Sequence, residues 1–195
     1  MTDSSPVARQ MILEPAGWYR ARTATVVGNA QIGRDTSVWF GSIIRCDVAP
    51  ITIGECTNIQ DGTIIHCETG IPNRIGSHIT VGHRALLHGA SIGDRALIGM
   101  GAILLSRCEI GEEAVVAAGC VVKEGFVVPP RTVVAGVPGK IVREVSEKEV
   151  AALLKSALRY RGLAQLWATH DVVTPEMVRE HDEREDLGPF RAGGG

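Results

Sequence analysis

The sequence has few aromatic residues, since only 4% of its 195 residues are Phe, Trp or Tyr, whereas glycine occurs 23 times. This composition favours a fold built from small side chains and many turns. An excess of basic charge is also lacking, because 20 Lys and Arg residues are set against 22 Asp and Glu and are scattered along the chain. We expect no nucleic acid partner, because phosphate binding needs clustered positive charge.

Signals for membrane insertion and secretion are missing too. No run of eighteen apolar residues occurs, and the start, MTDSSPVARQ, lacks the basic and then apolar order of a secretory signal. The five cysteines include no CxxC pair, and an odd number fits a reducing compartment better than a disulfide framework. We therefore predict a cytoplasmic protein with no membrane partner.

Aliphatic residues recur at every sixth position in the second half of the chain. A helix repeats every 3.6 residues and an ordinary strand every two, so neither explains this period. A period of six indicates short strands, each with one inward aliphatic residue, separated by regular turns. The unbroken run is Ile92, Ile98, Leu104, Ile110, Val116, Val122, Val128 and Val134.

The same period extends upstream with interruptions. Three residues are added near positions 48–50, four are added near 69–74, and one is missing before Ile92. Breaks in a regular array mark loops or sites. The upstream members are Val26, Ile32, Val38 and Ile44, then Ile53, Ile59 and Ile65, then Ile75, Val81 and Leu87.

This repeat resembles that of the hexapeptide-repeat proteins. The resemblance implies a left-handed parallel β-helix with three hexads, about 18 residues, in each triangular coil. The handedness rests on the resemblance alone, because parallel crossovers are otherwise right-handed. We therefore predict a mainly β fold, with an N-terminal extension at residues 1–17 and a left-handed parallel β-helix over residues 18–144.

The pattern changes to a helical one after the repeats. Ser146 and Glu149 form a capping box, which predicts a C-terminal α-helix within residues 145–170 that folds back along the solenoid. A charged tail follows at 171–195, with a short helix predicted to start at Pro175 and a disordered AGGG ending. The residues expected on the buried stripe of the long helix are Val150, Leu153, Leu154, Leu158 and Trp167.

Two histidines are expected to stack on one face of the solenoid. Removing the register breaks places Ile44, Ile65, Leu87 and Leu104 at one position of successive coils, and the residues that follow them are Arg45, His66, His88 and Leu105. Strands in adjacent coils are about 4.8 Å apart, so both imidazoles can reach one ion. Cys46 and Cys67 should stack in the same way, where a disulfide is possible but free thiols are favoured.

A third histidine, His83, belongs to the preceding face, with Asp61 beneath it and Gln60 beside Asp61. The extended path from His83 to His88 is roughly 16 Å, and a corner intervenes, so one subunit should not bring all three rings together. A neighbouring subunit could donate His83, which would make the site interfacial and the protein a cyclic homotrimer. The alternative is that these histidines are ordinary surface residues.

Three imidazole nitrogens with one open position are the ligand set of a hydrating or hydrolytic zinc site. Imidazole also suits copper, iron and nickel. A metal site at His66, His83 and His88 is therefore the favoured interpretation of the three histidines.

Longer segments resemble the γ-class carbonic anhydrase family. They are SVWFGSIIRCDVAPITIGECTNIQDGTIIHCE, IGSHITVGHRALLHGASIGDRALIGMGAILL and GVPGKIVRE, and the resemblance covers roughly residues 18–160. It implies that His66 and His88 of one chain and His83 of the next bind Zn²⁺, or Fe²⁺ or Co²⁺, in a homotrimer. The implied reaction is reversible hydration of carbon dioxide to bicarbonate by metal-bound hydroxide.

The resemblance also implies roles for four other residues. Gln60 would orient the metal-bound water or the bicarbonate, while Arg45, Asp47 and Asp61 would form interfacial ion pairs that line the pocket. The alternative for Arg45 and Asp61 is a purely structural role between subunits.

The chain departs from the family pattern at Val48, where an acidic residue is usual. Slow proton transfer would follow unless Glu68 substitutes, and Tyr160 is a further pocket candidate. Two competing functions therefore stay open: an acyltransferase or thioesterase of the same fold, and a non-catalytic metal-binding assembly subunit.

Overall fold

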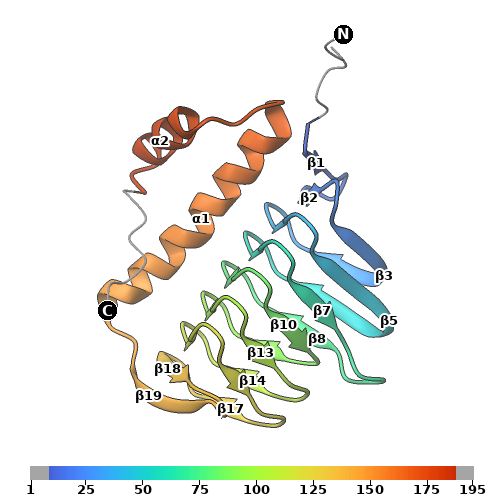
Figure 1. Ribbon diagram of the computed structural model, residues 1–195, viewed down its shortest axis with the longest axis vertical. Helices are drawn as coiled ribbons and strands as arrows, with labels where there is room; N and C mark the ends of the chain where they lie inside the picture. Colours follow the sequence, from blue (N-terminus) through green and yellow to red (C-terminus); the bar gives the residue numbers. More distant parts are fainter. Residues whose placement is uncertain (1–8, 188–195) are drawn as a thin grey trace.

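Inward-facing aliphatic side chains stack in register from coil to coil. In the computed structural model, which describes residues 9–187, Ile44 pairs with Ile65, Ile65 with Leu87, and Leu87 with Leu104 on successive parallel strands. All four side chains are completely buried. The predicted parallel β-helix with a C-terminal α-helix is confirmed, and the hexad register identifies its core (Figure 1).

The solenoid has three faces, which we name by what they carry. The helix face contains β2 (Tyr19–Ala21), β4 (Ser37–Val38), β6 (Asn58–Ile59), β9 (Thr80–Val81), β12 (Leu97–Ile98), β15 (Val115–Val116) and β18 (Thr132–Ala135). The histidine face contains the first parts of β3 (Thr25–Ile32) and β5 (Ile43–Ile53), then β7 (Ile64–His66), β10 (Leu86–His88), β13 (Ile103–Leu104) and β16 (Val121–Val122). The third face contains the second parts of β3 and β5, then β8 (Asn73–Ile75), β11 (Ser91–Ile92), β14 (Glu109–Ile110) and β17 (Val127–Val128).

Glycine follows the inward aliphatic residue in several hexads because successive coils approach closely there. A Cβ atom on Gly99 would lie 2.4 Å from the backbone nitrogen of Ala118, and one on Gly111 would lie 2.3 Å from that of Pro130. These distances are far below van der Waals contact. The Ile-Gly pairs of the repeat therefore reflect the spacing of the coils.

Both ends of the helix face are closed by antiparallel strands that the repeat did not predict. Strand β1 (Met11–Leu13) pairs with β2 at the first coil, and β19 (Lys140–Glu144) pairs with β18 at the last. Part of the expected N-terminal extension thus joins the sheet, whereas residues 1–8 and the AGGG ending lie outside the described residues. These short antiparallel strands cover edges that parallel coils would leave open.

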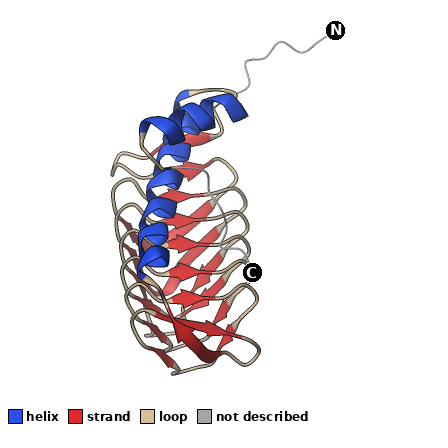
Figure 2. Cartoon of the chain, turned by 90° about the vertical axis from the view of Figure 1, so that its left-hand side faces the viewer, coloured by secondary structure: helices blue, strands red, loops and turns tan. Residues whose placement is uncertain are grey.

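Helix α1 (Glu147–Thr169) runs back along the helix face, as Figure 2 shows. Its buried side chains include Leu153, Ala157 and Ala164, but Leu154 is 36% exposed, so its predicted place on the buried stripe is wrong. Small residues face the sheet because the helix packs closely against it. Within the described chain, no helix is long and apolar enough to cross a membrane.

Helix α2 (Pro175–Arg184) begins at the predicted proline and packs back on α1. His181 and Asp182 are buried there, and Asp182 forms an ion pair with Arg159. A Cβ on Gly162 would lie 1.8 Å from His181 Nε2. Gly162 therefore allows the contact between the two helices.

The capping box at the start of α1 is present and is reinforced by an ion pair. The Glu149 carboxylate accepts a hydrogen bond from the backbone nitrogen of Ser146 at 2.9 Å, and Ser146 Oγ accepts one from the backbone nitrogen of Glu149. Arg143 donates to both carboxylate oxygens at 2.8 and 3.0 Å. These contacts, led by Arg143, lower the pKa of Glu149 to about 2.

We predict that Glu149→Gln destabilises the protein in a pH-dependent way. An unfolded glutamate has a pKa of about 4.3, so the wild-type carboxylate contributes stability above that pH and loses it as the pH falls toward about 2. Urea unfolding of both proteins should show the largest difference in free energy near neutral pH and a vanishing difference in acid. A pH-independent difference would contradict this.

Glu180→Gln is the matched control, because no ion pair of the Glu180 carboxylate occurs among residues 9–187. It should change the free energy of unfolding little at any pH.

Candidate metal centre

His66 and His88 lie side by side at the ends of two neighbouring strands. Strands β7 and β10 pair in parallel with His66 opposite His88, and the ring centroids are 5.4 Å apart. The predicted stacking of this pair is therefore observed. Parallel pairing in register is what brings the rings together, because strand separation is about 4.8 Å.

Each of these two rings has one nitrogen held by an oxygen. His66 Nε2 lies 3.1 Å from Asp47 Oδ1, to which it donates because a carboxylate only accepts. His88 Nδ1 lies 3.0 Å from Ser106 Oγ. Arg45 Nη1 donates to the other oxygen of Asp47 at 2.5 Å, and this contact, followed by that of His66, lowers the pKa of Asp47.

The second register break forms a loop after His66, and Asn73, the first residue of β8, ties the end of this loop to the site. Its side-chain nitrogen donates to the carbonyl oxygen of His66 at 2.7 Å, and its side-chain oxygen accepts from the backbone nitrogen of Ala90 at 2.8 Å. Asn73 is completely buried. Asn73 thus connects the end of the strand that carries His66 to the next coil.

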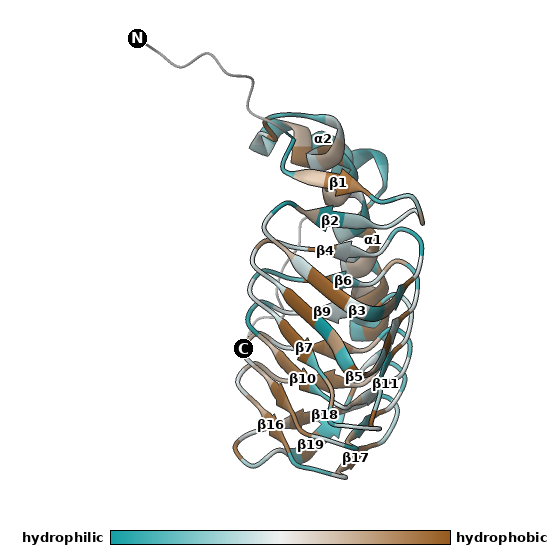
Figure 3. Ribbon diagram, turned by 90° about the vertical axis from the view of Figure 1, so that its right-hand side faces the viewer, coloured by the Kyte–Doolittle hydropathy of each residue, from teal (hydrophilic) through white to brown (hydrophobic). Residues whose placement is uncertain are grey.

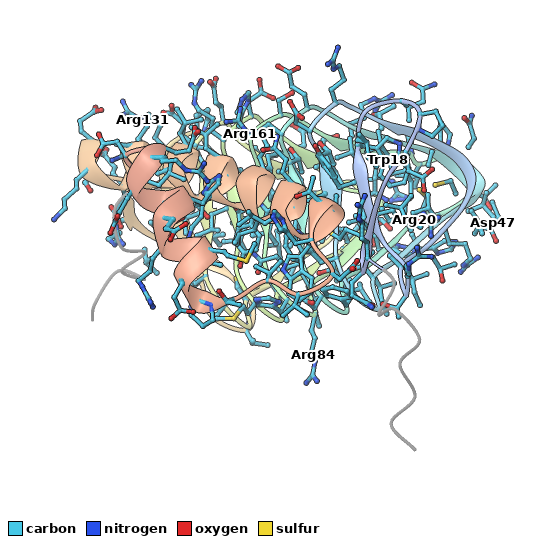
Figure 4. The ribbon with its side chains drawn as sticks, turned by 90° about the horizontal axis from the view of Figure 1, so that it is seen from above. Trp18, Arg20, Asp47, Arg84, Arg131 and Arg161 are labelled. Atoms are coloured by element: carbon cyan, nitrogen blue, oxygen red, sulfur yellow. The ribbon has the colours of Figure 1, made fainter. Side chains whose placement is uncertain are left out.

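His83 lies at a different corner of the solenoid, between the helix face and the histidine face. Its Nδ1 is 2.9 Å from Asp61 Oδ2, one coil away, as the expected column places them. Backbone hydrogen bonds tie these turns from coil to coil, since Arg84 N donates to Asp61 O and Gly101 N donates to His83 O, each at 2.9 Å. Figure 4 shows Arg84, the neighbour of His83, and Asp47, the partner of His66, projecting from well-separated parts of the molecule.

The histidine face lies between these two places. Its strands begin after the corner that carries Asp61 and His83 and end at His66 and His88. Within residues 9–187 of one chain, no three His, Cys, Asp or Glu side chains come together closely enough to hold a metal ion. One chain therefore brings two of the three candidate histidines together.

The three histidines nevertheless have the bonding pattern of metal ligands. One nitrogen of each ring is held by the oxygen of Asp47, Ser106 or Asp61, and the second nitrogen makes no hydrogen bond to another described residue. Histidines that bind a metal ion generally donate the other ring N–H to such an oxygen, which fixes the tautomer and the ring direction. The donor set therefore fits a metal ion that prefers imidazole.

The structure places Gln60 beside this donor set on the corner of Asp61 and His83. Its side chain is 4% exposed, and Nε2 donates to Asn58 Oδ1 at 3.1 Å. Tyr160 of α1 packs edge-on against Trp39, and burial, followed by the charge of Asp61, raises the pKa of Tyr160. The Tyr160 hydroxyl group therefore lies within electrostatic range of the Asp61 carboxylate.

Two residues that hold the histidines were missed by the sequence analysis. Ser106 follows Leu105, the next member of the column of His66 and His88, so extending the column by one coil could have found it. Asn73 stands at the end of the second register break. No signal in the hexads distinguishes it from a loop residue.

The remaining candidates lie near His66. Val48 is exposed, and Glu68 is 3.8 Å from Arg107 in an ion pair. All five cysteines are free and buried, including Cys46 and Cys67. Burial raises the pKa of the Cys46 thiol to about 11, with a smaller contribution from Cys67. The Cys46 thiol is therefore protonated near neutral pH.

The chain matches a known repeat family, and it is similar to proteins from several organisms. Residues 89–124 match the bacterial transferase hexapeptide family, described as six repeats. The crystal structure of a hexapeptide transferase family protein from Anaplasma phagocytophilum has a TM-score of 0.69 and 36% identity, covering 75% of this chain and 90% of that one.

Curated relatives carry carbonic anhydrase names. A carbonic anhydrase of Geobacillus kaustophilus is 43% identical over 145 residues, which is 74% of this chain and 80% of that protein. γ carbonic anhydrase 2 of Arabidopsis thaliana, a mitochondrial protein, is 39% identical over 166 residues, which is 82% of this chain and 60% of that protein. Because this identity extends over most of the coils that carry His66, His83 and His88, the chain belongs to the γ-carbonic anhydrase family.

Proposed function

We propose that the protein is a homotrimer that hydrates carbon dioxide reversibly to bicarbonate at three metal sites between subunits. The observation that carries this proposal is the division of the donor set between the two edges of one face. His66 and His88 end strands β7 and β10 of the histidine face, and His83 lies at its other edge, just before β10 begins. A cyclic arrangement of three copies brings one edge of each face to the opposite edge of the next.

An uncovered row of aliphatic side chains on the same face supports the contact between copies. These residues point outward on successive strands and stack in register, and Ile43 and Ile64 are 40% and 41% exposed. Figure 3 views this side, away from α1, with hydrophobic colouring on β7 and β10. Contiguous exposed apolar surface marks an interface. We call this row the apolar column: Ile43, Ile64, Leu86, Ile103 and Val121.

His66 and His88 of one chain, with His83 of the next, would hold the metal ion. Zinc is our first choice, and Fe²⁺ or Co²⁺ also suits imidazole donors. The ion supplies Lewis acidity, which lowers the pKa of water to about 7. Asp47, Ser106 and Asp61 fix the ring directions, and Arg45 neutralises the second oxygen of Asp47.

The other residues of the site handle substrate and protons. Gln60 presents an amide next to Asp61 and orients water or bicarbonate by hydrogen bonding. The family usually has an acidic residue at position 48, and Val48 cannot carry a proton. We therefore assign the role of proton carrier to Glu68. Its ion pair with Arg107 holds it at the corner that His66 and His88 reach.

A transferase function has support from the names of solved structures, among them the hexapeptide transferase family protein from Anaplasma phagocytophilum. Hydrolysis of acyl-CoA by the metal-loaded protein, without carbon dioxide hydration, would favour that function. Bound metal with neither activity would favour a non-catalytic assembly subunit. A cytoplasmic location stays a prediction.

We predict that the purified protein binds zinc and hydrates carbon dioxide, and that His66→Ala loses both. Removal of a ligand should lower kcat/KM by on the order of a hundredfold or more, since even residues that hold the ligands matter by ten- to a hundredfold. Elemental analysis and stopped-flow hydration measure the two effects. His78→Ala, at a half-buried bend on another corner between β8 and β9, should change neither.

We predict that His83→Ala and His66→Ala chains complement each other in mixed trimers. Co-expression with two affinity tags isolates trimers that contain both chains. Each mixed trimer has one interface that joins an intact His83 to an intact His66 and His88, so zinc content and hydration should return to about one third of wild type. Each variant alone should have neither. Confirmed mixed trimers without zinc would exclude His83 as a ligand across the interface.

We predict that Ile64→Glu separates the subunits. A charge in the middle of the apolar column would be buried without a partner in the trimer, so light scattering should report monomers. Val127→Glu is the matched control, because Val127 is exposed on the third face. It should leave the trimer intact. A trimeric Ile64→Glu protein would place the interface elsewhere.

A further inference from the structure

Four buried polar side chains form a hydrogen-bonded line from helix α1 to Gln60. Ser156 Oγ lies 3.1 Å from Thr80 Oγ1, Asn58 Nδ2 donates to Thr80 Oγ1 at 3.0 Å, and Gln60 Nε2 donates to Asn58 Oδ1 at 3.1 Å. All four residues are buried. The line joins β6 to β9 and then to the helix that covers them. We call it the amide line.

The amide line determines which way the Asn58 amide faces. Asn58 Nδ2 also donates to the carbonyl oxygen of Ile79 at 3.2 Å. A carbonyl oxygen only accepts, so a flipped Asn58 would place two acceptors against each other. With the Ile79 carbonyl oxygen and the Thr80 hydroxyl oxygen both accepting from Nδ2, Asn58 Oδ1 faces Gln60, and the NH₂ group of Gln60 donates to it. The Gln60 amide oxygen is thus the end that is directed away from Asn58.

Thr80 makes this arrangement depend on the helix. Its hydroxyl oxygen accepts from Asn58 Nδ2, so its own proton needs another acceptor. Among the hydrogen bonds of residues 9–187, Ser156 Oγ is the remaining partner of Thr80 Oγ1. Without Ser156, Thr80 would have to turn its proton toward Asn58 or leave it unpaired in a buried position.

We propose that Ser156 and Thr80 are positioning residues for Gln60, so that the docking of α1 sets the direction of the Gln60 amide oxygen. The inference rests on the proposed function only for what Gln60 does at the site. Gln60 lies beside Asp61, which holds His83. An amide oxygen directed away from Asn58 accepts a hydrogen bond from water or from the hydroxyl group of bicarbonate, whereas a flipped amide would offer a donor.

NMR of the purified full-length protein tests the positioning directly. Labelling glutamine side chains with ¹⁵N reports on Gln10, Gln31, Gln60 and Gln165, and Gln60→Ala identifies the signal of Gln60. Thr80→Val, which keeps the shape but removes the hydroxyl, and Ser156→Ala should both shift the Gln60 signal. Thr80→Ser keeps the hydroxyl and should leave it near the wild-type position. Circular dichroism and light scattering check folding and assembly.

Thr169→Ala is the matched control on the same helix, because its hydroxyl donates to the carbonyl oxygen of Gln165 in α1 itself. It should leave the Gln60 signal unchanged. An unchanged Gln60 signal in Ser156→Ala overturns the proposal, because the helix then has no influence on the amide. If Thr80→Val fails to fold, Ser156→Ala and Thr80→Ser still decide it.

Hydration kinetics separate this inference from the proposed function. Ser156→Ala and Thr80→Val should lower kcat/KM by about tenfold, the lower end for residues that hold site groups. The double variant should be no worse than Thr80→Val, since both changes break one line. If the Gln60 signal shifts as expected but Gln60→Ala hydrates carbon dioxide like the wild type, the positioning stands and the role of Gln60 in the proposed function fails.

Discussion

The site depends on the register between neighbouring coils. Backbone hydrogen bonds between parallel strands, together with the buried stack of Ile65 and Leu87, place His66 opposite His88. A slip of one residue would turn one ring inward and an aliphatic side chain outward, which the completely buried core resists. Packing of the core therefore fixes the directions of the two imidazoles. No large movement of the backbone is needed to form the pair.

The sequence predicted this part because the period of six encodes it directly. The hexads identify the inward residues, so the neighbours of those residues, including His66, His88 and the pair Asp61 and His83, follow by counting. Contacts that leave the repeat were not predictable in this way. Asn73 acts from the start of β8, directly after an irregular loop, and β1 and β19 pair antiparallel at the ends, where no hexad pattern exists.

The wrong prediction that Leu154 is buried also arises from a contact that a simple sequence period does not encode. A helical stripe drawn from hydrophobicity favours leucine, but the face that packs on a flat sheet is decided by how closely the two backbones approach. Ala157 and Ala164 permit that approach, and Ser156 is buried with them because Thr80 supplies its hydrogen bond. Ser156, a polar residue in the middle of the buried stripe, is therefore the informative position, and a stripe drawn from hydrophobicity does not include it.

Burial explains why the hydrogen bonds of the amide line constrain side-chain orientation more strongly than the ion pairs on the surface do. Exposed pairs such as Arg179 with Glu176 contribute little, because water screens them and both side chains lose freedom. Asn58 and Thr80, in contrast, are buried from solvent, so a lost partner costs the full desolvation penalty, and each keeps the orientation that satisfies its neighbours. The packing of the helix on the sheet therefore acts together with the Ile79 carbonyl oxygen to set the direction of the Gln60 amide, and in this proposal the helix is part of the architecture of the site.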